Sequence, residues 1–87
     1  MTNTQLHRHA INTLSLIDEN VKAIKACKDN LVLLQYDTAL TESMKAVFIE
    51  QQQGFLATLR DIKRNNVETY AEAMKRLVQP IIDKINY

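Results

Sequence analysis

The sequence has little of what interrupts or cross-links a chain. Its 87 residues include one glycine, one proline, one cysteine and no tryptophan. Because turn formers are so scarce, and because Leu, Ala, Lys, Gln and Glu are frequent, the composition favours long helices. We therefore predict an all-α fold, with residues 1–87 forming a single helical domain.

A lone cysteine, Cys27, excludes a disulfide within one chain and is typical of proteins of a reducing compartment. The first twenty residues lack the apolar core of a signal peptide. No run approaches the roughly 18 apolar residues that a membrane span needs. We therefore expect a cytoplasmic protein that does not bind membranes.

The charges nearly balance, with eleven Lys and Arg against ten Asp and Glu. This balance argues against duplex nucleic acid as a partner, since such binding relies on bulk positive charge. Local basic groups are present nevertheless, and clustered cations can hold phosphate oxygens. Asp18 and Asp29 can neutralise the first group, and a helix C-terminus would accommodate the second. The two candidate phosphate-binding groups are Lys22, Lys25 and Lys28, and Arg60, Lys63 and Arg64.

The residues that usually carry catalysis are not arranged for it. His7 and His9 are two apart, so they point in different directions on a helix and do not share a metal. Cys27 has no orienting base near it in the sequence. We expect no enzymatic activity, no metal and no cofactor.

The first predicted helix begins near Thr2 to Thr4, any of which can cap it. The helix either ends near Asp29 and Asn30 or bends there and continues to Tyr36. We favour a break or kink at these two residues, because an unbroken helix to Tyr36 would be about 50 Å long. Residues 30–36 would then form a short extra helix. Apolar residues recur at spacings of three, four and seven, close to a heptad repeat: Leu6, Ala10, Leu14, Ile17, Val21, Ile24 and Leu31.

A second predicted helix begins after Thr38 or Thr41 and ends at Asn65. Gly54 within it either allows a close backbone approach or is merely tolerated. The predicted inner face consists of Met44, Phe48, Phe55, Leu59 and Ile62.

A third predicted helix begins at Asn65, because Glu68 follows at the spacing of a capping box. Pro80 should kink or end this helix near Gln79. Its apolar residues are Val67, Tyr70, Ala71, Met74, Leu77, Val78, Ile81 and Ile85.

Three such helices predict an antiparallel three-helix bundle. The bundle leaves a surplus of apolar residues, above all the run from Leu31 to Leu34. Two interpretations remain open: a buried connector in the monomer, or a surface covered by another chain, which we favour. The second interpretation predicts a homo-oligomer, dimer or higher. Its interface residues would be Leu31, Val32, Leu34, Tyr36, Phe48 and Ile49.

The segment from Gln52 to Arg64, QQGFLATLRDIKR, resembles the amphipathic segment of small phage proteins that form helical oligomers and sequester cyclic-nucleotide signals of anti-phage defence. The resemblance covers thirteen of the 87 residues. In that family the segment lies near the C-terminus, whereas more than twenty residues follow it here. It implies a nucleotide-sequestering oligomer and transfers no binding residue.

Two hypotheses follow. In the first, the chain is a non-enzymatic protein that binds a partner protein stoichiometrically through an apolar helical face and inhibits or regulates it. In the second, an oligomer of the chain sequesters a small phosphorylated ligand, such as a cyclic nucleotide, on the basic groups.

Overall fold

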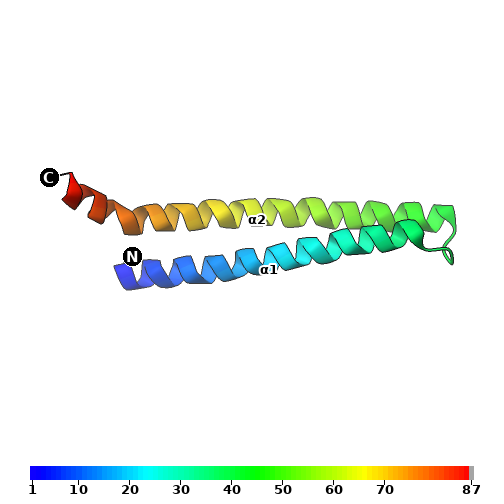
Figure 1. Cartoon of the computed structure of the whole chain (residues 1–87), viewed down its shortest axis with the longest axis horizontal. Coiled ribbons are helices and arrows are strands. Elements are labelled where there is room, and N and C mark those ends of the chain that lie inside the picture. The colour runs from blue at the N-terminus through cyan, green and yellow to red at the C-terminus, as the bar shows by residue number, and fades with distance from the viewer. Residues whose placement is uncertain (87) are drawn as a thin grey trace.

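The computed structural model describes residues 1–86, which form two long helices joined by a short loop. Helix α1 spans Asn3–Tyr36 and helix α2 spans Glu42–Ile85. The two helices run antiparallel, so that both ends of the chain lie at the same end of the hairpin (Figure 1). The prediction of an all-α fold is confirmed. The prediction of three helices is wrong, since the described residues form two.

Helix α1 continues through Asp29 and Asn30, where a break or kink was predicted, so the alternative of one helix to Tyr36 holds. Both residues are exposed, so their polar side chains remain in water and do not oppose the helix. Leu31 and Leu34 beyond them are partly buried against α2. The packing of these two leucines extends the helix, and the expected separate helix over residues 30–36 is the last part of α1.

Helix α2 likewise continues through Asn65 and Asn66, where one helix was predicted to end and another to begin. Asn66 donates a hydrogen bond to the side chain of Asn20 on α1 at 2.8 Å. The hydroxyl of Thr69 donates to the Asn65 carbonyl at 2.9 Å, in the manner of a residue inside a helix. The predicted capping box is therefore replaced by a contact between the helices.

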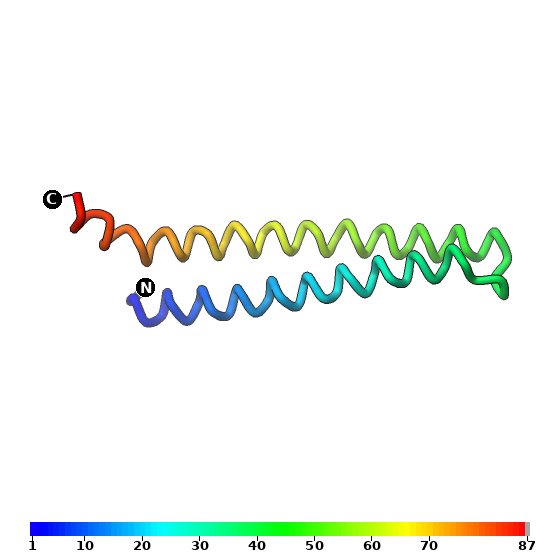
Figure 2. Tube along the Cα trace, in the orientation of Figure 1, coloured from blue at the N-terminus to red at the C-terminus, as the bar shows by residue number. Residues whose placement is uncertain are grey.

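Pro80 lies inside α2, as predicted, and removes the N–H that would bond the carbonyl of Arg76. Figure 2 shows the last turns of α2 bending away from the axis of the hairpin. None of the described residues after Gln79 is buried. The packed part of the hairpin therefore ends near Leu77.

The helices meet along a seam of residues spaced alternately by three and four, as in an antiparallel coiled coil. On α1 the buried or partly buried seam residues are Leu6, Ala10, Thr13, Ile17, Asn20, Ile24, Cys27, Leu31 and Leu34. On α2 they are Lys45, Ile49, Gln52, Leu56, Leu59, Lys63, Asn66, Tyr70, Ala73 and Leu77.

Two apolar clusters fill this seam, one near the loop and one near the open end. The closed-end cluster has Ile24, Cys27 and Leu56 at its centre, with Leu31 and Leu59 packed against them. The open-end cluster has Leu6, Ala10 and Ala73 at its centre, with three partly buried neighbours. These neighbours are Tyr70, Met74 and Leu77. The Asn20–Asn66 hydrogen bond lies between the two clusters and fixes the register of the helices.

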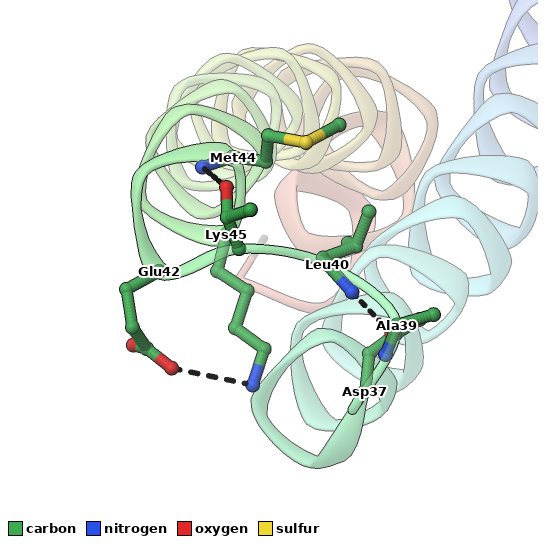
Figure 3. A network of polar contacts seen from close by, with 7 residues as sticks. Asp37, Ala39, Leu40, Glu42, Met44 and Lys45 are labelled. Atoms are coloured by element: carbon green, nitrogen blue, oxygen red, sulfur yellow. Dashed lines mark hydrogen bonds and ion pairs between the residues drawn. The ribbon is translucent and has the colours of Figure 1, made fainter.

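The loop is held by side-chain hydrogen bonds at both of its ends. The Asp37 carboxylate accepts from the backbone N–H groups of Ala39 at 2.7 Å and Leu40 at 3.1 Å. The Thr41 hydroxyl accepts from the N–H of Met44 at 3.2 Å and so caps α2. These contacts form one network around the turn (Figure 3). The direction in which α2 leaves the loop is therefore fixed locally.

Lys45 adds a charge at this end of the hairpin. Its side chain is 16% exposed and lies 3.8 Å from the Glu42 carboxylate. Figure 3 shows it extending toward the last turn of α1, which has no basic residue of its own. The positive charge of Lys45 interacts favourably with the negative end of the α1 dipole.

The hairpin is as long as its longer helix, with principal extents of 67 × 20 × 17 Å. It exposes 6804 Å² of surface. A compact protein of this mass exposes about 5,200 Å². No residue is fully buried among those described, and many large apolar side chains lie at the surface. The hairpin thus has a narrow core and a large apolar exterior.

Candidate interaction surfaces

The seam divides the rest of each helix into two flanks. Residues that immediately precede a seam residue form one flank, as Phe48 precedes Ile49, and residues that immediately follow one form the other, as Val67 follows Asn66. The two helices are antiparallel. A rotation by 180° about the axis perpendicular to the plane of the two helices exchanges α1 with α2, and it leaves each side of the hairpin in place. Preceding residues of both helices therefore share one side, and following residues share the other.

Two shallow hollows agree with this geometry, because each is lined by preceding residues from both helices. One near the open end includes His9 of α1 and Thr69 and Arg76 of α2. One near the loop includes Asn30 of α1 and Phe48 of α2. The same side of the hairpin is therefore defined at both of its ends.

The side of the preceding residues carries an apolar surface that extends from the loop to the middle of the hairpin. Phe48, Phe55 and Ile62 recur every seven residues along α2, and all three are exposed. Small alanines lie opposite them on α1. We call this surface the phenylalanine face, and it consists of Leu16, Ala23, Ala26, Leu33, Phe48, Phe55 and Ile62.

The side of the following residues carries a second apolar surface, displaced toward the open end. Ile11, Leu14 and Val21 line a hollow on α1 together with Ile17 of the seam. Asp18 interrupts this stripe and pairs with Lys22 at 3.0 Å. We call this surface the valine face, and it consists of Ile11, Leu14, Val21, Val67 and Val78, all exposed.

Basic residues lie on the same side as the valine face, next to it in the direction of the loop. Arg60, Lys63 and Arg64 line one shallow hollow, together with Val67 and Glu68. Two lysines of α1, Lys25 and Lys28, lie on the same side of the hairpin, because each follows a seam residue. We call this group the basic patch, and it consists of Lys25, Lys28, Arg60, Lys63 and Arg64.

The structure therefore places most of the two predicted phosphate-binding groups, which are far apart in the sequence, on one side of the hairpin. Lys22 is the exception, because it precedes no seam residue and follows none, and it pairs with Asp18 on the outer side of α1. Arg64 pairs with Asp61 at 3.0 Å. Within residues 1–86 the other four members of the basic patch have no ion pair.

The residues predicted to form an interface fall into two groups. Leu31, Leu34 and Ile49 are seam residues, partly buried between the helices of one hairpin. The others are exposed, but they lie on different sides: Phe48 on the phenylalanine face, Val32 on the opposite side, and Tyr36 on the outer side of α1. The run from Leu31 to Leu34 is thus half core and half surface. A role for these residues in an interface remains a prediction.

Cys27 is buried in the seam, where its thiol lies 3.1 Å from the Gln52 backbone carbonyl and 3.2 Å from the Gln52 side-chain oxygen. The thiol therefore acts as a small packed group with a hydrogen-bond acceptor. Among residues 1–86, no three His, Cys, Asp or Glu side chains come together as metal ligands. Neither helix is long and apolar enough over its described length to cross a membrane.

Sequence reasoning missed Leu16, Ala23, Ala26 and Leu33 as surface residues that belong together. Their spacing of seven, three and seven was a visible signal, but only beside a known seam does it identify a flank. Comparison of the chain with protein-family models, curated proteins and solved structures finds no match. The interaction surfaces are therefore interpreted from their own chemistry.

Proposed function

We propose that the chain is a non-enzymatic binding protein that associates with itself and regulates or inhibits a partner protein by stoichiometric docking. The carrying observation is the hairpin's narrow core, with two apolar faces left at the surface on opposite sides. Monomeric proteins rarely expose apolar patches of this extent unless the patches bind something. The single cysteine, reduced and buried, supports a cytoplasmic site of action.

The partner in this proposal is an amphipathic helix of another protein, apolar on one stripe and acidic toward one end. The valine face supplies a hollow on α1, lined by Ile11, Leu14 and Val21, for the apolar stripe. The basic patch continues along the same side, where unpaired Lys25, Lys28 and Arg60 would attract acidic side chains. Charge complementarity therefore favours one orientation of the bound helix.

Site-specific photo-crosslinking in the source cells tests this proposal. A benzoylphenylalanine at Val67 should capture one partner protein, whereas the same group at Val47, on the outer side of α2, should not. The purified partner should then bind the chain one to one. R60E/R64E should weaken that binding at least tenfold, because it reverses two charges of the patch. Equal capture from both positions, or binding indifferent to the charge reversal, would refute the proposal.

A second candidate function, sequestration of a phosphorylated ligand, is favoured by one observation. Arg60, Lys63 and Arg64 line a single hollow of about 400 Å³, and Lys25 and Lys28 lie on the same side of the hairpin. The guanidinium group of each arginine can bind phosphate through two N–H donors. Calorimetry with cyclic di- and trinucleotides should give heats that decrease as salt is added. An absence of heat at micromolar protein would exclude this function.

A further inference from the structure

We infer that the phenylalanine face pairs with the same face of a second copy of the chain, giving a four-helix bundle of two hairpins. This inference deepens the proposed function, on which it rests, because it names the surface used for self-association. It is independent of the valine face, which lies on the opposite side and stays free in such a pair.

The large apolar residues of α2 are not all turned toward α1. Between the loop and Ile62, the stripe of α2 that faces α1 includes the polar residues Lys45 and Gln52. The stripe beside it carries Phe48, Phe55 and Ile62. The hairpin therefore leaves both phenylalanines of the chain on a stripe that faces away from its own α1. Burial of these side chains is favourable in proportion to their area, and it requires another surface.

The side that carries the phenylalanine face has almost no charge in this half of the hairpin. Preceding residues between Leu16 and Leu33, and between Met44 and Ile62, include one charged residue, Glu19. The polar residues among them, such as Gln51 and Thr58, are neutral. A symmetric interface brings each patch against itself, so like charges within the patch would repel. This face is nearly free of such charges, whereas the opposite side carries the basic patch and would repel its own copy.

The shape of the phenylalanine face also favours pairing with a second copy of itself. The face has a ridge of large side chains on α2 and a trough at Ala23 and Ala26 on α1. A surface with both features is complementary to itself under a two-fold rotation, because the ridge of each copy can enter the trough of the other. A shallow hollow of about 270 Å³ beside Leu33 and Phe48 offers further space near the loop.

The exposed surface area of one hairpin also favours pairing. The hairpin exposes 6804 Å², which is about 1,600 Å² more than a compact protein of its mass. A stable interface buries about 800 Å² on each partner. The excess is about twice what such an interface covers on one chain, so the hairpin has enough surplus surface for an interface of this kind.

Sedimentation equilibrium of the purified full chain tests the inference, with F55E as the variant and V47E as its matched control. Phe55 and Val47 are 59% and 54% exposed on the same helix, but Val47 lies outside the phenylalanine face. The wild type and V47E should have the mass of two chains. F55E should have the mass of one, because a charge buried in the interface weakens the pair about a hundredfold or more.

A26E provides a second variant in case F55E disturbs the hairpin. Ala26 is exposed and glutamate favours helices, so the fold should remain while the trough is filled. The inference is overturned if the wild type is a monomer, if A26E leaves the dimer intact, or if V47E dissociates it as F55E does. A monomer that still binds its partner through Val67 would refute self-pairing alone. A dimer that captures no partner would refute the proposed partner alone.

Discussion

The two apolar clusters of the hairpin differ in the side chains that meet across the seam. Near the loop, branched aliphatic residues from both helices interlock, with Ile24 and Leu31 of α1 against Leu56 and Leu59 of α2. Near the open end, two alanines take central places, Ala10 and Ala73, each 3% exposed. The loop also ties the helices together next to the first cluster. We therefore expect stability to be concentrated at the closed end, while the open end holds the helices through smaller contacts.

The largest expected effect is at the closed end. L56A should lower the free energy of unfolding by about 3 kcal/mol, since it leaves a cavity in the better packed cluster. L6A should cost less, about 2 kcal/mol, because the open end can separate locally while the rest stays folded. Urea unfolding followed by circular dichroism measures both. Equal losses would show that the two clusters form one cooperative unit of uniform strength.

The Asn20–Asn66 hydrogen bond lies at the boundary between the two clusters, and its removal tests how far their stabilities are coupled. N66L should lower the free energy of unfolding by about 1 kcal/mol, because the partly buried amide of Asn20 loses its partner. N20L/N66L should recover this loss by joining the two clusters into one apolar seam.

The neighbouring N65L is the control, because Asn65 is exposed and the hydrogen bond to Asn20 is made by Asn66. A double-mutant cycle in urea gives the coupling between the two asparagines. If N66L alone is as stable as the wild type, the amide pair contributes nothing to stability.

The smallest expected effects concern the two helix caps. T41A should lower the free energy of unfolding by about 1 kcal/mol, because Thr41 caps α2 at the tightly packed closed end. T2A removes an equivalent cap, a capping box between Thr2 and Gln5, at the loosely packed end. Its effect should be confined to faster amide exchange in the first turn of α1. A global loss from T2A equal to that from T41A would contradict the difference between the ends.

The helical class was predictable from composition, but the number of helices was not. The 3-4 spacing through Leu59, Lys63, Asn66 and Tyr70 is unbroken, although two of its members are polar. Asn65 and Glu68 offered a competing local signal, and local signals carry no information about a partner on another helix. Only the position of Asn20 across the seam explains why Asn66 belongs inside α2.

The choice of inner face shows the same limit for the candidate surfaces. Of the residues predicted to face inward on the first half of α2, only Leu59 lies in the seam. Met44, Phe48, Phe55 and Ile62 form the most apolar stripe and were therefore assigned to the core of the monomer. A periodic pattern shows that a stripe needs cover, but it does not show which chain provides it. Gly54 was undecided for a similar reason. A methyl group added there meets nothing within 4 Å, so the glycine serves no close approach inside the hairpin.

The placement of the two apolar faces on opposite sides of the hairpin affects how tightly a partner would be held. In a symmetric pair joined through the phenylalanine face, two valine faces point outward, one from each chain. A partner that is itself dimeric, or that carries two suitable helices, would bind both, and its second contact would form at a high effective concentration. Avidity would then multiply a weak single contact, and a variant that only separates the two hairpins would release such a partner without altering any residue that touches it.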